Sequence, residues 1–474
     1  MKKRRSIRAI PLFVAVLAAI MHFPVSVQSA TLEVGTGKPY ATIQSAIADA
    51  HSRDTVLVDD GKYIENINFL GKAITVKSVN GAIKTIIDGN LNGTVVTFSS
   101  SEGSNSVLDG FLLTNAKRTA VSSFLNGGGI YCYSASPSIK NCIIDGNQPD
   151  YGGGIYCELS SPLIVNCTIT NNWAMSAGGG IFLKSSSPSI SKCIISHNGS
   201  SGGAGLSLLM SSPSITNCFI VRNGTNYSFG GGISCHNSSP KITNCTISDN
   251  SVSTMPSGFE VGGGMYCDDA SSPTVLNSIF WGNVAKNEID LSEDSSINIT
   301  YSDIEGGWEG SGNIDADPLY IYSNDNVPDY HLTDSSPCID KGTSAGAPTD
   351  DIDNDPRPQG AGFDMGADEV KVILNDSDGD GVPDDSDQCP DSALSPTIVI
   401  GECDTGVANE ISDDGCTRQD LINDCINTAR NKGAVVMCVA HLTNAWKRKG
   451  LITGNEKGKI QRCAAKIKRK ISKG

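Results

Sequence analysis

One sequence motif occurs six times between Gly127 and Asn283, and this repeat limits the folds open to the chain. Its form is Gly-Gly-Gly-Ile-aromatic-Cys followed by Ser-Pro-x-Ile-x-Asn-Cys-x-Ile-x-x-Asn. The prolines that mark successive copies are 25, 26, 25, 27 and 33 residues apart, and they are Pro137, Pro162, Pro188, Pro213, Pro240 and Pro273. A near-constant period of this length predicts a stack of similar structural units.

The composition of each copy favours strands over helices. Leucine-rich repeats have a similar period, but they require a leucine-rich strand signature followed by a helical pattern, and neither is present. Each copy instead holds short β-branched runs separated by Gly, Asn and Ser-Pro, which predict three brief strands and three turns. The expected fold class is therefore all-β, a parallel β-helix solenoid over residues 31–303.

Strand alternation assigns the side chains of each copy to faces, because residues i and i+2 point the same way. Cys142 and Ile144, and their equivalents in later copies, are thus expected inside the coil. Since neighbouring coils lie about 4.8 Å apart, equivalent residues should form columns in which stacked amides hydrogen-bond. One predicted column contains Asn141, Asn166, Asn217, Asn244 and Asn277, with Lys192 as an exception, and another contains Asn147, Asn172, Asn198, Asn223, Asn250 and Asn283.

A column of aromatic residues is predicted on the outside of the coil. Tyr131, Tyr156 and Phe182 occupy the outward position after the glycine triplets of consecutive copies, and Tyr266 occupies it further along. Because sugar rings stack on exposed aromatic rings, Tyr131, Tyr156 and Phe182 are the candidate ligand-binding residues of a glycan-binding strip. Packing beneath a loop is the alternative interpretation.

Residues 1–30 have the features of a secretory signal peptide. Basic residues precede an apolar run from Ala9 to Ile20, and small residues up to Ala30 suit a cleavage site. The run is shorter than the roughly 20 residues that a membrane span requires, and no later segment is long and apolar enough to span. The mature chain is therefore expected to be secreted or held at the cell surface without a transmembrane anchor, and retention in the periplasm stays open.

The segment from Thr31 to Gly89 links the chain to a known family. Helical spacing of Ile43, Ile47 and Ala50 predicts a short amphipathic helix that covers the open end of the coil. The segment resembles the N-terminal coils of the pectin-lyase-like right-handed β-helix superfamily, and the repeats continue the resemblance to about Asp303. The resemblance implies a right-handed coil. Many members cleave acidic polysaccharides, with carboxylates or with Ca²⁺ and a basic residue.

Catalytic groups of that kind are sparse in the repeats, so no catalytic residue is assigned. Glycoside hydrolysis requires two carboxylates at a set separation on one face. His197 and His236 fall in different turns, and Lys184 and Arg222 have no evident partner in the repeat register. The carboxylates are scattered at Asp145, Asp150, Glu158, Asp249, Glu260, Asp268 and Asp269. We expect a non-enzymatic role, with a polysaccharide lyase or glycoside hydrolase acting on acidic polysaccharide as the alternative.

Residues 304–372 are predicted to form a loop-rich cap on the C-terminal end of the coil. They contain the motifs SSPCIDKG, DIDNDPRP and DMGADE, which resemble the closing segment of secreted β-helix proteins. From Asp350 to Asp391, fourteen acidic residues stand against two basic ones. Carboxylates at this density repel one another unless a cation is present.

A calcium site is predicted within residues 373–403. Oxygen donors at loop positions 1, 3, 5, 9 and 12, a carbonyl at 7 and Gly at 6 match an EF-hand-like pattern. The predicted ligands are Asp376, Asp378, Asp380, Val382, Asp384 and Asp387. Pro383 argues against a regular EF-hand, and with Cys389-Pro390 the run resembles a thrombospondin type 3 repeat. Calcium would be a structural ion that stiffens a spacer, and a plain acidic linker is the alternative.

Residues 404–474 are predicted to form a small helical module with disulfides. Helical spacing and two capping boxes predict three short helices between about 417 and 471. Cys389 with Cys403 is one expected bridge, and three pairings are open to Cys416, Cys425, Cys438 and Cys463. The nine repeat cysteines should stay buried thiols, because the column spacing of about 4.8 Å exceeds the usual disulfide Cβ separation of about 3.8 Å.

Charge narrows the expected partners. A net charge of −15 argues against nucleic acid as a partner of the body of the protein. From His441 to Gly474 eleven basic residues face one Glu, which suits either contact with an anionic polysaccharide or a solvated helix face. The expected function is adhesion or the binding of polysaccharide or a cell-surface glycan, with structural calcium.

Overall fold

The computed structural model describes residues 29–117, 126–225, 229–253, 262–323, 327–371, 377–382, 384, 387–412 and 414–467. The predicted signal peptide, apart from its last two residues, lies outside the described residues. The chain divides into two compact units, Met1–Glu369 and Val370–Gly474. The division falls next to the predicted start of the calcium repeat.

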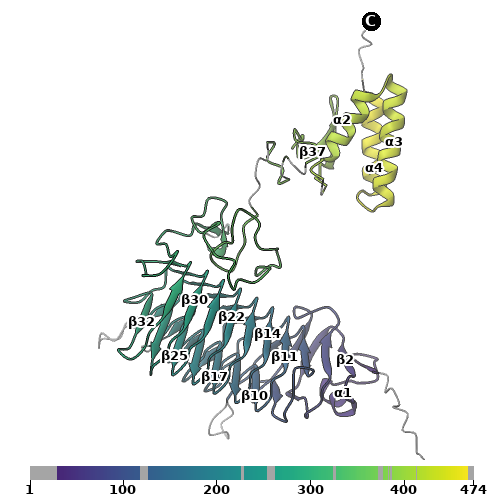
Figure 1. Ribbon diagram of the computed structural model, residues 1–474. Coiled ribbons are helices and arrows are strands. Elements are labelled where there is room, and N and C mark those ends of the chain that lie inside the picture. Colours follow the sequence, from purple (N-terminus) through teal and green to yellow (C-terminus); the bar gives the residue numbers. More distant parts are fainter. Residues whose placement is uncertain are drawn as a thin grey trace, which may run out of the picture. The chain divides into compact units, whose positions relative to one another are not determined.

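The first unit is a parallel β-helix, which confirms the fold class predicted from the repeat (Figure 1). In the described residues, three long sheets run along the coil, and we name them A, B and C. Sheet A contains β1 (Thr31–Val34), β2 (Thr55–Val58), β5 (Thr75–Ser78), β8 (Val107–Asp109), β11 (Ser138–Lys140), β14 (Leu163–Val165), β18 (Ser189–Ser191), β22 (Ser214–Thr216), β26 (Lys241–Thr243), β30 (Thr274–Leu276) and β33 (Asn298–Thr300). Sheet B contains β3 (Gly61–Ile64), β6 (Thr85–Asp88), β9 (Leu112–Thr114), β12 (Ile143–Asp145), β15 (Thr168–Thr170), β19 (Ile194–Ser196), β23 (Phe219–Val221), β27 (Thr246–Ser248), β31 (Ile279–Trp281) and β34 (Asp303–Ile304). Sheet C contains β4 (Ile67–Asn68), β7 (Val96–Phe98), β10 (Ile130–Tyr133), β13 (Ile155–Glu158), β17 (Ile181–Lys184), β21 (Leu206–Leu209), β25 (Ile233–His236), β29 (Met265–Asp268) and β32 (Ile289–Leu291).

A fourth, very short sheet was not predicted from the repeat. It contains β16 (Trp173–Ala174), β20 (Gly199–Ser200), β24 (Gly224–Thr225) and β28 (Ser251–Val252). Each of these strands directly follows an asparagine of the second predicted column. Because that column aligns the backbone of successive coils, two more residues per coil come within hydrogen-bonding distance.

The interior of the coil has the predicted side chains. Cys142 is 1% exposed and Ile144 is fully buried. The residue after each cysteine of the motif pairs with its equivalent in the next coil, as Ile143 does with Thr168. The predicted inner column is thereby confirmed, and it consists of Cys142, Cys167, Cys193, Cys218 and Cys245.

The column cysteines are thiols, as predicted. All nine repeat cysteines and Cys338 are buried and outside disulfides. Burial raises the pKa of Cys142 well above its ordinary value, so the side chain stays protonated and unreactive. On unfolding without reductant, we expect titration with a thiol reagent to find ten free thiols per chain. A count near zero would contradict the assignment.

The second asparagine column is continuous through the coil. In each step the backbone N–H and the side-chain Nδ2 of one asparagine both donate to Oδ1 of the next, as Asn198 does to Asn223 at 3.0 Å. The same amide nitrogen also donates to a backbone carbonyl, as from Asn223 to Ile195 at 2.8 Å. The column therefore supplies hydrogen-bond partners to buried backbone groups at a turn, which the strands of the three long sheets do not reach. It links Asn147, Asn172, Asn198, Asn223, Asn250 and Asn283.

Glu288 ends this column. The backbone N–H of Asn283 donates to Oε1 of Glu288 at 2.9 Å, and Nδ2 of Asn283 donates to Oε2 at 2.6 Å. Burial raises the pKa of Glu288 to about 8, and the neighbouring Glu305 adds to the rise. The protonated carboxyl is thus the form that the folded coil favours near neutral pH.

This shift predicts a pH dependence of stability. Because the folded pKa of about 8 exceeds the ordinary value of 4.5, the contribution of Glu288 is complete below about pH 4.5 and is lost as the pH rises through 8. The loss is on the order of 4 kcal/mol. In urea titrations across this range, Glu288→Gln, which is always neutral, should fall less steeply with pH than the wild type. Equal slopes would contradict the role of Glu288.

The first asparagine column has the left-handed backbone expected of it, with φ near +50° from Asn141 to Asn277. Its exception, Lys192, has a separate role, because its Nζ lies 2.7 Å from Oδ2 of Asp350. Further along the column, Nδ2 of Asn217 donates to the carbonyl of Asp350, and Nδ2 of Asn244 donates to that of Asp364. The last rungs of this column therefore bind the segment that follows the coil.

That segment was predicted to cap the C-terminal end of the coil, and its first residues do lie there, because Ile314 pairs with Asp303 and Trp308 packs against the core. It contains the hairpin β35 (Tyr320–Tyr322) and β36 (Pro328–Leu332), and its loops lie beside β22 and β30 (Figure 1). The hydroxyl of Tyr320 contacts Ser248 on sheet B at 2.7 Å, and the hydroxyl of Tyr330 donates to Asp249 at 2.8 Å. The start of the segment thus lies on the end of the coil, and its later loops pack on the side of the final coils, where amides of the first asparagine column donate to them.

Two of the motifs in this segment meet in its interior. Arg357 of DIDNDPRP and Glu369 of DMGADE form a fully buried ion pair at 2.6 Å. Glu369 also accepts hydrogen bonds from the backbone of Gln359 and Asp364. Arg357 and Glu369 therefore serve the fold of the segment.

The N-terminal helix α1 (Ile43–Asp49) lies where it was predicted and buries Ile43, Ala46 and Ile47.

In the second unit, α2 (Arg418–Thr428), α3 (Lys432–Arg448) and α4 (Gly454–Lys466) confirm the three predicted helices, and α2 and α4 begin with the predicted capping boxes. A hairpin of β37 (Thr397–Ile400) and β38 (Cys403–Ala408) was not predicted. Its signal is the β-branched run that ends at Gly401.

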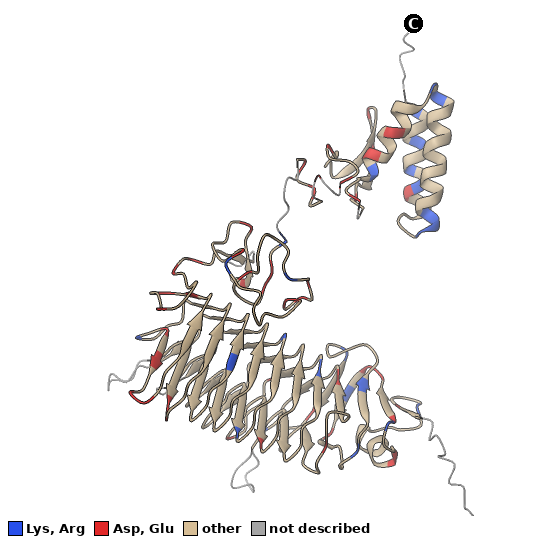
Figure 2. Ribbon diagram, viewed as in Figure 1, with Lys and Arg blue, Asp and Glu red and all other residues tan. Residues whose placement is uncertain are grey.

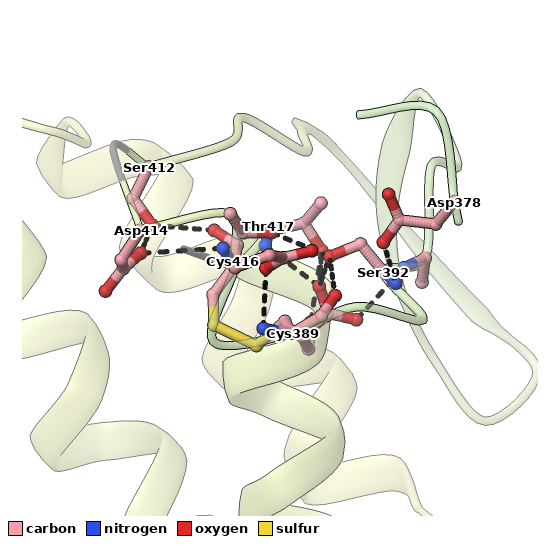
Figure 3. The surroundings of a disulfide bond; sticks show 11 residues. Asp378, Cys389, Ser392, Ser412, Asp414, Cys416 and Thr417 are labelled. Carbon is pink, nitrogen blue, oxygen red and sulfur yellow. Dashed lines mark hydrogen bonds between the residues drawn. A yellow bond between two sulfur atoms is a disulfide. The ribbon is translucent and has the colours of Figure 1, made fainter. Parts of the chain in front are cut away.

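The disulfides of the second unit correct the predicted pairing. Cys389 pairs with Cys416, and Cys403 pairs with Cys463, so the expected bridge between Cys389 and Cys403 is wrong. Cys425 pairs with Cys438. The reason is the unpredicted hairpin, which packs β38 against α4 and brings Cys403 to Cys463. Figure 3 shows the bridge of Cys389 and Cys416 beside the capping residue Thr417.

Candidate functional site

The outer surface of sheet C, which we call the sheet C face, carries two parallel columns of side chains. Both arise because alternate residues of four-residue strands point outward and pair in register from coil to coil. The first column contains Tyr131, Tyr156, Phe182, Ser207, Ser234 and Tyr266. The second contains Tyr133, Glu158, Lys184, Leu209, His236 and Asp268.

The three predicted aromatic residues lie together on consecutive coils. The ring centroids of Tyr131 and Tyr156 are 5.6 Å apart, and those of Tyr156 and Phe182 are 5.4 Å apart. Tyr151 packs on Phe182 at 5.4 Å. As a result Tyr156 is 3% exposed and Phe182 is 7% exposed. These two rings therefore fit the alternative interpretation, in which the aromatic residues are packed against other side chains. Glycan contact stays a prediction, and Tyr131 is the member of the three with more exposed surface.

Tyr133 adds accessible ring surface that was not predicted. It is 41% exposed, and its ring centroid lies 6.4 Å from that of Tyr131 with an angle of 10° between the planes. Both side chains leave the same strand, β10, two residues apart. The signal was present in the alternation of Tyr131 and Tyr133 around the inward Cys132.

Lys184, expected to lack a partner, has one on the neighbouring coil. Its Nζ lies 2.8 Å from Oε1 of Glu158, and the hydroxyl of Tyr156 donates to Oε2 of Glu158 at 3.0 Å. The ammonium group of Lys184, followed by the Tyr156 hydrogen bond, holds the pKa of Glu158 below its usual value against the effect of burial. This pair gives the sheet C face polar groups beside the aromatic rings.

His236, which was expected in a different turn from His197, also has polar partners. Nδ1 of His236 lies 2.5 Å from Oδ1 of Asp268 on the next coil, and Nε2 lies 3.1 Å from Oγ of Ser234. Arg222, for which no partner was expected either, lies 3.8 Å from Asp249 and stacks over Tyr330. The acidic partners, Asp268 for His236 and Asp249 for Arg222, each lie one coil away.

The predicted calcium loop is described in part. Asp376, Pro383 and Asp385 lie outside the described residues. Asp378, Asp380 and Asp387 each offer a carboxylate oxygen, and these oxygens lie within 4.8 Å of one another. Asp384 is not in this group, and its carboxylate accepts two hydrogen bonds from Ser377 at 2.8 Å.

The donor set of the loop fits a hard cation. Oδ1 of Asp387 accepts a hydrogen bond from the backbone of Cys389 at 2.6 Å. Its Oδ2 is buried and has no hydrogen-bond partner among the described residues, and a buried carboxylate oxygen in that state is costly unless a cation lies nearby. Asp378 accepts a hydrogen bond from the backbone of Ser392, beside the disulfide of Cys389 (Figure 3). The loop is therefore tied to the helical module.

Charge is distributed unevenly between the two units (Figure 2). The strands of the coil carry few charged residues, whereas lysine and arginine gather on α3 and α4. None of the helices in the described part of the chain has both the length and the apolar character that crossing a membrane requires.

Comparison with known proteins agrees with this architecture. Residues 82–233 match the family model described as "Right handed beta helix region", so the fold class is a right-handed parallel β-helix. No curated protein matches the chain.

Solved structures with a similar fold have low sequence identity to this chain. Pectate lyase Pel9A is 15% identical, with a TM-score of 0.45 over 73% of this chain and 97% of that one. Pectin methylesterase PemA from Erwinia chrysanthemi is 15% identical, with a TM-score of 0.33 over 65% and 93%. A pectin methylesterase in complex with a hexasaccharide is 14% identical, with a TM-score of 0.33 over 60% and 90%. At these values the comparisons describe the fold alone.

Proposed function

We propose that this chain is an exported, non-enzymatic β-helix protein that binds polysaccharide or a cell-surface glycan through the sheet C face. The observation that carries the proposal is the pair of nearly parallel rings of Tyr131 and Tyr133 on β10, 6.4 Å apart. Two such rings form a platform for sugar rings, and the nearby Glu158 and Lys184 offer hydrogen-bonding groups. Adhesion to a glycan-bearing surface is the corresponding biological role.

Retention on immobilised polysaccharides tests this proposal. The double variant Tyr131→Ala and Tyr133→Ala should bind at least about tenfold more weakly than the wild type, a difference of about 1.4 kcal/mol. Tyr322→Ala is the matched control, because Tyr322 is 56% exposed on β35, away from the sheet C face. Equal retention of the double variant and the wild type would overturn the proposal.

A lyase or glycoside hydrolase is the second candidate, favoured by the contact of His236 with Asp268 on the same face. An imidazole beside a carboxylate is a common acid–base pair. Incubation with uronic-acid polysaccharides, with and without Ca²⁺, separates the two functions. If the wild type produces new unsaturated or reducing ends and His236→Asn does not, the function is catalysis and not binding alone.

For the second unit we propose a structural Ca²⁺ ion at Asp378, Asp380 and Asp387. Calorimetric titration of the whole chain with Ca²⁺ should show binding that weakens at least about tenfold in Asp387→Asn, because the variant loses a charged ligand and its buried oxygen. Asp424→Asn on the exposed side of α2 is the control. If titration of the wild type with Ca²⁺ releases or absorbs no heat, the loop is an acidic linker without a calcium site.

A further inference from the structure

The second column of the sheet C face ends in a cluster of one imidazole and two carboxylates. His236 is the last residue of β25, Asp268 is its partner in register at the end of β29, and Asp269 follows directly. One ligand atom from each of the three lies within 4.8 Å of the other two. Asp269 has a left-handed backbone, with φ of +50°, and it is exposed, so the cluster is open to solvent on that side.

The imidazole of His236 is held in place by its neighbours. Oγ of the fully buried Ser234 lies 3.1 Å from Nε2. The rings of Phe229 and Tyr266 pack edge-on against the imidazole, with centroids 5.9 and 6.2 Å away. A histidine whose second nitrogen is engaged by a hydrogen bond is the usual arrangement of a metal ligand, because that bond fixes the tautomer and the ring orientation.

Asp268 is a partly buried carboxylate that faces His236. Its Oδ1 is buried, and the polar atom facing it is Nδ1 of His236 at 2.5 Å. The carboxylates of Asp269 and of Asp290, which follows Tyr266 in register, add negative charge nearby. Two close carboxylates and an imidazole lone pair repel one another unless a proton or a metal ion lies between them.

We propose that His236, Asp268 and Asp269 bind a divalent transition-metal ion of the Zn²⁺ type. An imidazole ligand favours zinc, copper, iron or nickel over Ca²⁺ and Mg²⁺, which take oxygen ligands. Zinc binds imidazole nitrogen and carboxylate oxygen at about 2.0–2.2 Å, and ligand atoms within 4.8 Å of one another can converge on one ion. Three protein ligands leave a coordination position open toward the solvent side of Asp269.

His331 is a second histidine that lies among carboxylates, but its two ring nitrogens have different partners from those of His236. Nε2 of His331 lies 2.8 Å from Asp353, and Nδ1 lies 3.4 Å from Asp329. Both nitrogens of His331 face carboxylates, so the positive charge of a protonated imidazole offsets the negative charge of Asp329 and Asp353. His236 differs because Nε2 faces the neutral Ser234 and Nδ1 faces Asp268, so a metal ion bound there would take the place of the proton between Nδ1 and the carboxylate.

Calorimetric titration of the whole chain with ZnCl₂ tests the site, with any polyhistidine tag removed and with excess Ca²⁺ present to fill the oxygen-lined loop of the second unit. The wild type should bind Zn²⁺, and His236→Asn and Asp269→Asn should each weaken binding at least tenfold. Asparagine tolerates the left-handed backbone at position 269, so Asp269→Asn should keep the fold, as checked by circular dichroism.

His331→Asn and His197→Asn are the matched histidine controls, and both should bind Zn²⁺ as the wild type does. The site would be overturned if wild type and Asp269→Asn bind Zn²⁺ equally, if the wild type shows no zinc binding, or if binding is lost in His331→Asn instead. The experiment measures the metal alone, so its outcome is independent of whether the sheet C face binds a glycan.

Discussion

Gly178→Ala is expected to prevent stable folding of the coil. Gly178 is the first glycine of its triplet and has φ of +66°, and an added Cβ would lie 2.6 Å from both the carbonyl oxygen of Ile181 and Cβ of Phe182. A left-handed conformation alone costs a non-glycine residue about 1–2 kcal/mol. With the backbone clash, we expect a loss on the order of 4 kcal/mol or more, measured as a lower urea midpoint or the absence of soluble protein.

Gly202→Ala is the control for this substitution. An added Cβ at Gly202 would lie 3.6 Å from the carbonyl oxygen of Ser176, an ordinary contact. The chain itself shows that the position in the triplet matters, because Ala204 replaces the middle glycine of its copy and is fully buried there. If Gly178→Ala unfolds at the same urea concentration as Gly202→Ala, the steric account of the triplets is wrong.

Asn223→Leu is expected to destabilise the coil by about 3–5 kcal/mol, because it leaves buried polar groups unpaired at about 1–3 kcal/mol each. Leucine branches at Cγ as asparagine does, but it is larger and cannot accept from the backbone N–H of Asn198 or donate to the carbonyl of Ile195. The break also separates the column into two shorter runs of amides. Urea unfolding followed by circular dichroism measures the loss.

The exposed Asn105, which lies outside both columns, provides the matched control. Asn105→Leu should change the free energy of unfolding by less than about 0.5 kcal/mol. Because each coil contacts mainly its neighbours, unfolding can begin near the altered coil, so the two variants are compared by their midpoints and slopes together. Similar curves for Asn223→Leu and Asn105→Leu would show that the column is dispensable.

The repeat predicted the parts of the molecule that depend on neighbouring coils. The period and the alternation place Cys142 over Cys167 and Asn198 over Asn223. When the inner face of the coil is apolar, a shift of the register by one residue would turn the apolar side chains outward, so a single register is favoured. The aromatic column was found for the same reason. What the pattern did not show is how much of Tyr156 and Phe182 remains exposed, since exposure depends on Tyr151, which comes from a turn between strands.

The candidate sites were predicted less completely because their partners come from different copies. Glu158 and Lys184, like His236 and Asp268, are equivalent positions of adjacent coils, so aligning the copies by strand would have paired them. The association of Lys192 with Asp350 could not be found in this way, because 158 residues separate them and residues 304–369 have no repeat. The disulfide pairing failed for a similar reason, since the hairpin that positions Cys403 was not recognised.

Hydroxyl-radical footprinting of tyrosine side chains, with and without a bound polysaccharide, tests the central proposal most directly. The proposed binding surface predicts that the ligand lowers oxidation of Tyr131 and Tyr133 and leaves Tyr322 unchanged. Protection confined to residues outside the sheet C face, with Tyr131 and Tyr133 oxidised as in the free protein, would contradict it.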